Sequence, residues 1–449
     1  MGTSLKPVIM TRTYRILIAA VFAVWVGLTA YGVYQTGLER DVVREWVVAK
    51  YVIAGRDPFS LARDVLTAEF GVGNPGNARV SRIPEHAPEA RRGDVLPEYG
   101  TPEATYPPPA IGLIAGGLGF LDDPAAVVQA WFVLNVVMTL WLALGLSRMW
   151  RTPPAPLQRG GNFWWILLLV VLFTPTYANL ERGPFSLLVI GMILVVEDPS
   201  IGWALRGAAL GVALLKPSVT LPFLFLPLVR REWRVLATAV VVQALASGYV
   251  MIQTGKHLSL FLDWLAVSKY FLAPGMYTIQ EWLHRLSAAA PWLSPVVSLS
   301  ILAACAASLE ANKHLPRAWL FSLTGVTAMF WTYHGTYDSI FLLPMLLRRI
   351  GWSNQESARP WSIAGVVLFT ALSIGLMDRV VGSHDPIWHA YRWIIRLTMI
   401  GVFVKEYVDL YREGRRVKAE ALALEFANPQ RSRADDQPAP ITPPDHFRD

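Results

Sequence analysis

An aspartate at the start of an amphipathic segment is the first residue in this chain that suggests a chemical role. After Asp41, apolar residues recur at helical spacing while charged residues fall on other faces: Val43, Trp46, Val47 and Tyr51 against Arg44, Glu45 and Lys50. Gly55 and Pro58 mark the expected end of this helix. One interpretation of Asp41 is a helix cap, because a carboxylate at this position accepts backbone N–H bonds. The other is a catalytic carboxylate held near a membrane surface, because a strongly apolar stretch precedes it.

Lys216 interrupts a long apolar segment. A lysine inside a membrane span costs ~2.5–3.5 kcal/mol on insertion scales, so it normally faces a polar cavity or a partner. Snorkelling of the ammonium group toward the surface is the alternative, but Leu214, Leu215 and Val219 place this lysine deep in the segment. Pro217 is expected to bend the helix here, because it cannot donate a backbone hydrogen bond. We therefore expect a phosphate or a buried acid beside Lys216.

A tyrosine-rich segment further along the chain carries the remaining polar groups of interest. His334 and Asp338 lie four residues apart and would share one face of a helix, with Tyr333 and Tyr337 beside them. A local hydrogen-bonded pair and a contact with a phosphate or sugar explain this pattern equally well. Two ligands at this spacing are too few for a metal site, and the single cysteine, Cys305, excludes a cysteine-based site. We expect neither a metal nor a cofactor.

Composition indicates that membrane spans position these residues. Of 449 residues, 53% are hydrophobic and 16% charged, whereas soluble domains have about 25% charged residues. The net charge of +7 lies in short clusters between apolar stretches, which is typical of membrane proteins rather than of nucleic-acid binding. We expect an all-α polytopic membrane protein with about twelve spans. The segments are 16–34, 107–121, 125–147, 162–177, 184–197, 204–228, 234–252, 293–309, 318–332, 338–347, 361–378 and 388–408.

The basic clusters predict the orientation of these spans. Counted alternately from a cytoplasmic N-terminus, four clusters fall on the cytoplasmic side, as the positive-inside rule requires. They comprise Lys6, Arg12 and Arg15; Arg230, Arg231 and Arg234; Arg348 and Arg349; and Arg412, Arg415, Arg416 and Lys418. One loop disagrees, because Arg148, Arg151 and Arg159 would then lie outside. The region 107–197 is therefore where we expect the count to need revision.

The same count divides the chain into three parts. Residues 1–15 form a cytoplasmic N-terminus, 16–409 a transmembrane domain, and 410–449 a basic and then disordered cytoplasmic tail. Two long segments, 35–106 and 253–292, fall on the extracytoplasmic side. Long ordered loops are usually functional, and we expect helices lying in the membrane interface within them.

Six motifs in a fixed order add a resemblance to a known family. They are Asp41, Gly55-Arg56-Asp57-Pro58-Phe59, Thr105-Tyr106-Pro107-Pro108-Pro109, Asn179-Leu180-Glu181-Arg182-Gly183-Pro184, Leu210-Gly211-Val212-Ala213-Leu214-Leu215-Lys216-Pro217 and Tyr333-His334-Gly335-Thr336-Tyr337-Asp338. Together they resemble glycosyltransferase family 87, integral membrane enzymes of the GT-C fold that use polyprenyl-phosphate-linked mannose or a related sugar. The resemblance covers roughly 16–350. It departs at Gly183-Pro184, where a Gly-Gln pair is expected.

The resemblance implies a GT-C-like helical bundle with a long first extracytoplasmic loop whose acidic residue is the general base. Asp41 matches that position, while Asp57 and Asp64 are competitors, of which Asp57 better fits a turn before Pro58. An inverting transfer needs one base, because a phosphate leaving group needs no acid, whereas a glycoside hydrolase needs two carboxylates. Donor phosphate and substrate contacts are expected from Arg40, Arg44, Tyr106, Arg182, Lys216, Tyr333, His334 and Asp338.

The expected partners are a polyprenyl-phosphate sugar donor, a lipid or glycan acceptor, and membrane lipids, with no nucleic acid. The enzyme would be a hexosyltransferase of the cell membrane with its active site on the extracytoplasmic side. A secondary transporter or flippase is the alternative. It explains the spans and Lys216 but not an acid at the start of a long first loop, and the chain lacks the internal repeats of many transporters. A non-catalytic scaffold of an envelope-assembly complex is a third interpretation.

Overall fold

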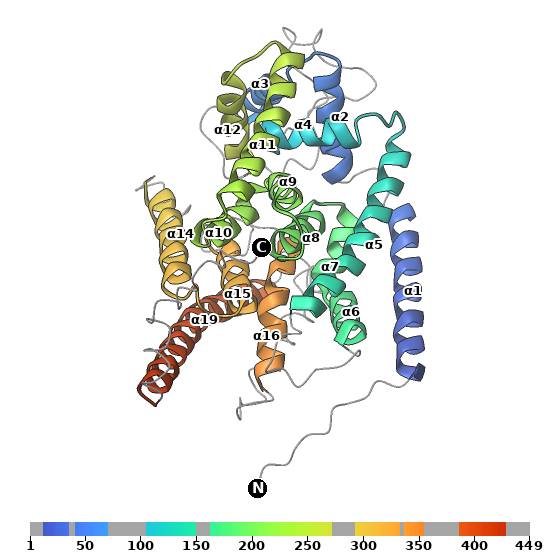
Figure 1. Cartoon of the computed structure of the whole chain (residues 1–449). Helices are drawn as coiled ribbons and strands as arrows, with labels where there is room; N and C mark the ends of the chain where they lie inside the picture. Colours follow the sequence, from blue (N-terminus) through green and yellow to red (C-terminus); the bar gives the residue numbers. More distant parts are fainter. Residues whose placement is uncertain are drawn as a thin grey trace, which may run out of the picture.

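The computed structural model describes residues 12–35, 41–70, 105–149, 162–271, 292–332, 336–353 and 386–427. Within these ranges the chain forms helices and no strand, which confirms the expected all-α class (Figure 1). The expected span 361–378, residues 71–104 of the expected loop 35–106 and the tail from 428 onward lie outside the described residues.

Four described helices are long and apolar enough to cross a membrane. They are α1 (Arg12–Gln35), α5 (Pro124–Met149), α11 (Trp233–Thr254) and α14 (Leu293–Ala311). The pair α6 (Asn162–Leu172) and α7 (Thr174–Arg182), bent by 65°, adds a fifth if it is counted as one span. The protein is thus a multi-pass helical membrane protein, while the expected count of about twelve spans is not confirmed.

Four shorter helices connect two charged clusters in the interior. They are α8 (Ser186–Glu197), α9 (Trp203–Ala213), α10 (Pro217–Val229) and α15 (Arg317–Ala328), each 11 to 13 residues long. At 1.5 Å per residue they measure about 16–20 Å, well short of the ~30 Å of a hydrocarbon core. Such short helices at membrane depth need neighbouring protein around their ends.

The first cluster, which we name the site end, is defined by Ser186, Lys216 and Asp338. Ser186 starts α8, Lys216 lies between α9 and α10, and Asp338 belongs to the 3-10 helix η2 (Thr336–Leu342). The indole of Trp331, which follows α15, donates to the carbonyl oxygen of Ser218 at 2.5 Å and joins α15 to the same end. Three helix breaks therefore meet at one place.

The second cluster, the arginine end, is defined by Glu197, Arg206, Arg230, Glu232 and Arg317. Arg206 pairs with Glu232 at 2.5 Å, and Arg230 contacts both carboxylate oxygens of Glu197 at 2.8 Å. Arg317 at the start of α15 donates to the backbone carbonyl of Glu197 at 2.5 Å. Since Arg206 starts α9 and Glu232 follows α10, these two helices form a hairpin with Lys216 at its turn.

This hairpin corrects the expected continuous span 204–228. Pro217 ends the helix rather than bending it, because the residue before a proline is driven out of the α conformation. Lys216 accordingly has φ −122° and ψ 77°, and Pro217 takes the first turn of α10, where its missing N–H costs nothing. Lys216 therefore lies at a helix junction, not in the middle of a span.

The arginine end also removes the disagreement over Arg148. Its guanidinium lies 3.9 Å from Asp198, the residue that follows Glu197, so Arg148 and Arg230 lie at the same end of the molecule. The alternating count had placed them on opposite sides of the membrane. That count was wrong because 204–228 turns back on itself and because α4 (Pro108–Gly117), the expected span 107–121, has only ten residues.

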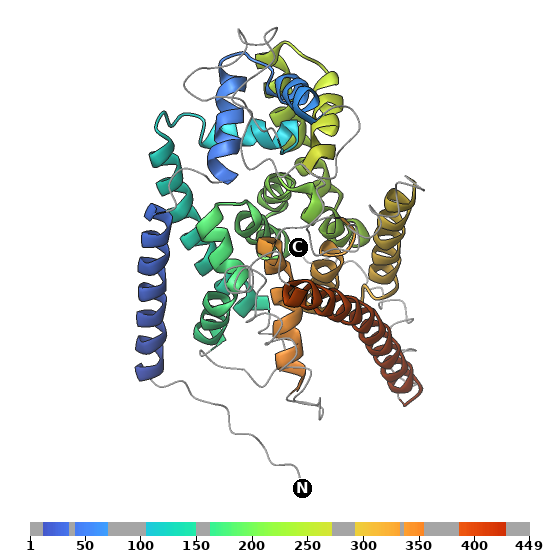
Figure 2. The same cartoon turned by 180° about the vertical axis from the view of Figure 1, so that it is seen from behind.

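A group of helices lies beyond the site end, at the top of Figure 1 and again in the reverse view of Figure 2. It comprises α2 (Asp41–Ile53), α3 (Pro58–Phe70), α4 and α12 (Ser259–Phe271), packed on the far part of α11. Gly112 lies so close to Ala246 that an added Cβ would be 2.2 Å from its carbonyl oxygen. A side chain at Gly112 would push α4 away from α11.

Helix α2 differs from the amphipathic helix that the sequence predicts. Its boundaries agree, since it runs from Asp41 to Ile53 and Gly55 follows with φ 71°. However, Glu45 and Lys50, expected on polar faces, are buried. Lys50 reaches Asp122 at 2.8 Å, so α2 packs against other elements on nearly every side.

The C-terminal part of the chain packs against α14 and α15. Helix α16 (Leu343–Ser353) follows η2, and Arg348 in it pairs with Glu406 of α19 (Pro386–Ala427). Glu406 also accepts a hydrogen bond from Ser322 of α15 at 2.6 Å. Helix α19 includes the expected span 388–408 and continues through the basic segment that was expected to begin the tail.

Candidate active site

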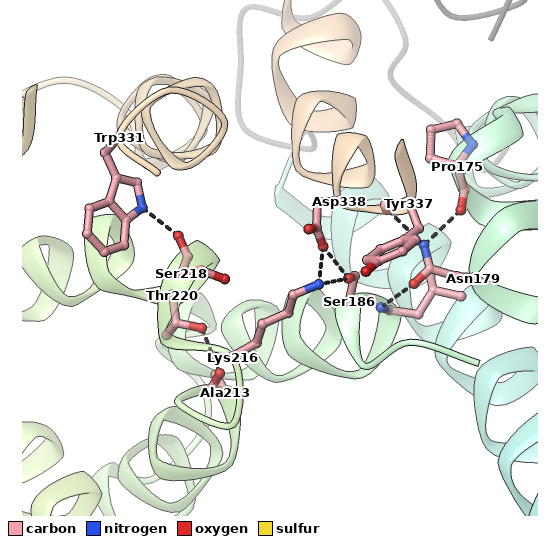
Figure 3. A network of polar contacts seen from close by, with 11 residues as sticks. Pro175, Asn179, Ser186, Ala213, Lys216, Ser218, Thr220, Trp331, Tyr337 and Asp338 are labelled. Carbon is pink, nitrogen blue, oxygen red and sulfur yellow. Dashed lines mark hydrogen bonds and ion pairs between the residues drawn. The ribbon is translucent and has the colours of Figure 1, made fainter. Parts of the chain in front are cut away.

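A buried ion pair forms the centre of the site end (Figure 3). Lys216 Nζ lies 2.5 Å from Asp338 Oδ1 and donates to Ser186 Oγ at 3.1 Å. The Ser186 hydroxyl donates to the same carboxylate oxygen at 2.5 Å. The ammonium also lies over the ring of Tyr337, 4.5 Å from its centroid. Lys216 and Asp338 are only 8% and 1% exposed, so the expected buried acid beside the lysine is present.

Asn179 holds the three polypeptide segments around this pair in register. Its Nδ2 donates to the carbonyl oxygens of Pro175 at 2.7 Å and Tyr337 at 2.9 Å. Its Oδ1 accepts a bond from the backbone N–H of Leu187 at 3.3 Å. One buried amide thus ties α7, the start of α8 and η2 together, as Figure 3 shows. The position of Asp338 relative to Ser186 depends on it.

Gly183 connects this network to the helix that carries Asp41. It caps α7 in the left-handed conformation, with φ 74°, where glycine has no steric penalty. An added Cβ would lie 3.1 Å from Val42 and 3.3 Å from Trp131. The chain departs from the expected family pattern here, yet the glycine itself has a structural reason: it lets α7 end against the first turn of α2.

Asp41 begins α2 and faces a set of basic side chains. Asp41 is partly buried, and desolvation raises the pKa of its carboxyl group above the ordinary value, an effect opposed by the positive charges of Arg44, Lys216 and Arg182 and reinforced by Asp338. A carboxylate with a raised pKa is a stronger proton acceptor in its ionised form. The residues predicted from sequence at 44, 182, 216 and 338 therefore lie within electrostatic range of Asp41.

Tyr106 enters the same neighbourhood from the segment before α4. Its ring lies edge-on to Phe185 at 5.1 Å. The pKa of its phenol is raised well above the ordinary value, first by burial and then by Tyr337, Asp41, Glu45 and Asp338. Tyr106 thus remains a neutral hydrogen-bond donor beside the carboxylates.

The competing acids have other roles in the structure. Asp57 Oδ1 accepts bonds from the backbone N–H groups of Phe59 at 3.1 Å and Ser60 at 3.2 Å, so Asp57 caps α3 as expected for a turn residue. Asp64 pairs with the neighbouring Arg63 at 2.9 Å. Arg40, Tyr333 and His334 lie outside the described residues, so the predicted helical pairing of His334 with Asp338 is not observed. Helix η2 begins only at Thr336.

Sequence reasoning missed two polar residues at the site end and one near it. Ser186 and Asn179 lie in or just after the motif that ends at Pro184, which was their only local signal. Glu45 follows Asp41 by one helical turn, a spacing visible in the sequence, but its charge placed it on a solvent face. In the described part of the chain, no group of three or more His, Cys, Asp or Glu residues is placed to hold a metal ion.

These observations define a helical membrane protein whose helix breaks surround a buried, charged site. The match to a known family is specific: residues 104–333, just over half of the chain, match glycosyltransferase family 87. The chain belongs to this family and is a membrane glycosyltransferase. Comparisons with curated proteins and with solved structures found no match. Asp41 and Asp338 lie outside the matched residues, but the fold brings both to Lys216 within them.

Proposed function

We propose that this protein moves a hexose, mannose by family resemblance, from a polyprenyl-phosphate donor to a hydroxyl of a lipid or glycan acceptor, with inversion. The observation that carries the proposal is the position of Asp41, a carboxylate with a raised pKa at the start of α2 and within electrostatic range of three cations. A lone base suits the chemistry, because the phosphate of the donor leaves without protonation. The site supplies the base and the positive charge together.

In the proposed reaction Asp41 accepts the proton of the acceptor hydroxyl. The hydroxyl oxygen forms a bond to the anomeric carbon of the sugar while the bond from that carbon to the phosphate oxygen breaks. The bond electrons leave with the polyprenyl phosphate. Burial supports this role for Asp41, because a desolvated carboxylate binds a proton more strongly than one in water.

Lys216 is the proposed contact for the donor phosphate, assisted by Arg44 and Arg182. A lysine ammonium has three N–H donors, and the contacts to Asp338 and Ser186 account for two. The arginines add planar donor groups suited to phosphate oxygens. Arg40, His334 and Tyr333 remain proposed substrate contacts on the strength of sequence alone, while Tyr106 and Asp338 border the sugar.

The proposed orientation places the arginine end in the cytoplasm and the site end toward the extracytoplasmic side of the cell membrane. Arg148, Arg206, Arg230 and Arg317 gather at one end, and cytoplasmic ends of membrane proteins carry the excess of arginine and lysine. The group of α2, α3, α4 and α12 then covers the site from outside, where lipid-linked sugars are used.

The experiment that tests the proposal incubates membranes containing the protein with radiolabelled polyprenyl-phosphate sugars and identifies the labelled product. Asp41→Asn should lower kcat by about 10²–10⁴-fold, the usual contribution of general base catalysis. Asp64→Asn is the matched control, because Asp64 pairs with Arg63 outside the site, and it should keep wild-type transfer.

Wild-type activity of the Asp41→Asn variant would contradict the assignment of the base. Direct use of a nucleotide sugar would contradict the donor class. Uptake of a labelled solute into vesicles without sugar transfer would instead support the transporter or flippase interpretation.

A further inference from the structure

Glu45 is a buried carboxylate that has no role in the proposed reaction. It follows Asp41 by one turn of α2, so the two side chains lie on the same side of the helix. Glu45 is 2% exposed, and its Oε1 accepts a hydrogen bond from the hydroxyl of Thr105. Burying a carboxylate is unfavourable unless its oxygens have partners. The burial of Glu45 therefore indicates a specific structural or functional role.

The segment that carries Thr105 is held from two directions. The Thr105 hydroxyl bonds to Glu45 on α2, and the Thr105 carbonyl oxygen accepts a bond from Trp264 Nε1 on α12 at 3.1 Å. Tyr106 follows directly and precedes Pro107, which restricts it to extended backbone conformations. Once Thr105 is fixed, little freedom remains in the direction of the Tyr106 side chain.

Tyr106 is the link from this anchor to the reacting groups. Its ring packs against Phe185, one residue before Ser186, and its phenol lies within electrostatic range of Asp41, Tyr337 and Asp338. A small rotation of the Thr105–Tyr106 segment would move the phenol away from these groups. The place of the Tyr106 phenol near Asp41 therefore depends on contacts made by Thr105.

We propose that Glu45 is a positioning residue for the transfer reaction: through Thr105 it fixes the Tyr106 hydroxyl beside Asp41 and so orients the base toward the acceptor. This inference rests on the proposed function of Asp41. In this proposal Glu45 acts on the reaction through its hydrogen bond with Thr105 and not through contact with donor or acceptor.

A double-mutant cycle tests this path. Glu45→Ala and Thr105→Val each remove one partner of the bond and should each lower kcat about 10–100-fold, with the KM for the donor unchanged. The double variant should be no slower than either single variant, because both break the same path. Glu45→Gln and Thr105→Ser keep an acceptor and a donor and should retain activity within about twofold. A double variant whose loss equals the product of the two single losses would overturn the proposal.

A second measurement does not depend on activity. With 3-fluorotyrosine placed at position 106, the ¹⁹F chemical shift reports the surroundings of the ring. The shift should change in Glu45→Ala and in Thr105→Val, and it should stay near that of the parent protein in Thr105→Ser. An unchanged shift in Glu45→Ala would overturn the proposal even if that variant were inactive.

The two proposals fail in different ways. An active Asp41→Asn variant would contradict the proposed base, and the ¹⁹F measurement would still decide whether Glu45 positions Tyr106. An inactive Asp41→Asn variant combined with multiplicative losses at Glu45 and Thr105 would contradict the role of Glu45 alone.

Discussion

The site end and the arginine end are both buried charged clusters at the tips of the same short helices, yet they are built differently. At the arginine end each carboxylate meets guanidinium groups, and Glu197 receives two hydrogen bonds from one arginine. At the site end one lysine meets one carboxylate and one hydroxyl, with Asp41 and two arginines nearby. The arginine end consists of carboxylate–guanidinium pairs, whereas the site end gathers a lysine, carboxylates, a hydroxyl and arginines around helix breaks.

This difference follows from the helix breaks. At the arginine end the helices simply begin and finish, and their charged residues tie neighbouring ends together. At the site end Gly183 ends α7 and Pro217 begins α10. The polar side chains next to these helix breaks point toward one another. Irregular backbone at membrane depth is tolerated where protein surrounds it or where it lines a cavity, and functional sites of membrane proteins often occupy such places.

The strongest test of the comparison removes the lysine. Lys216→Met leaves the Asp338 carboxylate buried without its cation, which should cost about 3–5 kcal/mol of unfolding free energy. It should also lower kcat/KM about 10²–10³-fold through loss of charge at the donor phosphate. SDS titration of the protein in mixed micelles measures the stability, and the radiolabel assay measures the transfer.

The double variant Lys216→Met/Asp338→Asn separates these two effects. Neutralising Asp338 removes the buried charge, so part of the lost stability should return while transfer stays low. Recovery of transfer together with stability would mean that Lys216 only neutralises Asp338, and the two ends would then be alike.

A matched change at the arginine end should lower stability and leave the transfer rate nearly unchanged. Arg206→Met removes the partner of Glu232 and the bond to the Val196 carbonyl, and should cost about 1.5–3 kcal/mol, the range for hydrogen bonds to charged groups. The kcat of the protein that remains folded should change by less than about twofold, because the proposed reacting groups lie at the other end of α9. A tenfold loss of kcat in the folded fraction, measured below the unfolding transition, would show that the two ends are coupled.

Local signals in the sequence correctly predicted the features that depend on neighbouring residues, such as helix ends and caps. Asp41 starts its helix, Gly55 and Pro58 end it where expected, and Asp57 caps the next one. Lys216 has the buried acid that its apolar surroundings required. In each case the cause lies within a few residues of the effect, or in the high cost of a lone charge in an apolar environment.

Long-range contacts decided the rest. Pro217 predicted a break in the helix but not the reversal of the chain direction, which brings Arg206 into an ion pair with Glu232. The acid beside Lys216 lies 122 positions away in the sequence, so local patterns could not identify it. Glu45 has the charge of a surface residue, yet it is buried where α2 packs against other helices and it accepts a hydrogen bond from Thr105, 60 positions away. A pattern of polar and apolar residues cannot distinguish such a carboxylate from a solvated one.

The smallest predicted effect concerns the electrostatics that set the two ends apart. Arg44 is the strongest of the charges that lower the pKa of Asp41, so Arg44→Gln should raise this pKa further. The proposed transfer requires the ionised carboxylate, so activity should be present above the pKa and lost as pH falls through it. The acidic limb of the pH profile of kcat should therefore move to higher pH. Arg56→Gln, a change at an exposed arginine beyond the end of α2, should leave the limb in place. If the limb moved to lower pH in Arg44→Gln, or moved equally in both variants, the titrating base would not be Asp41.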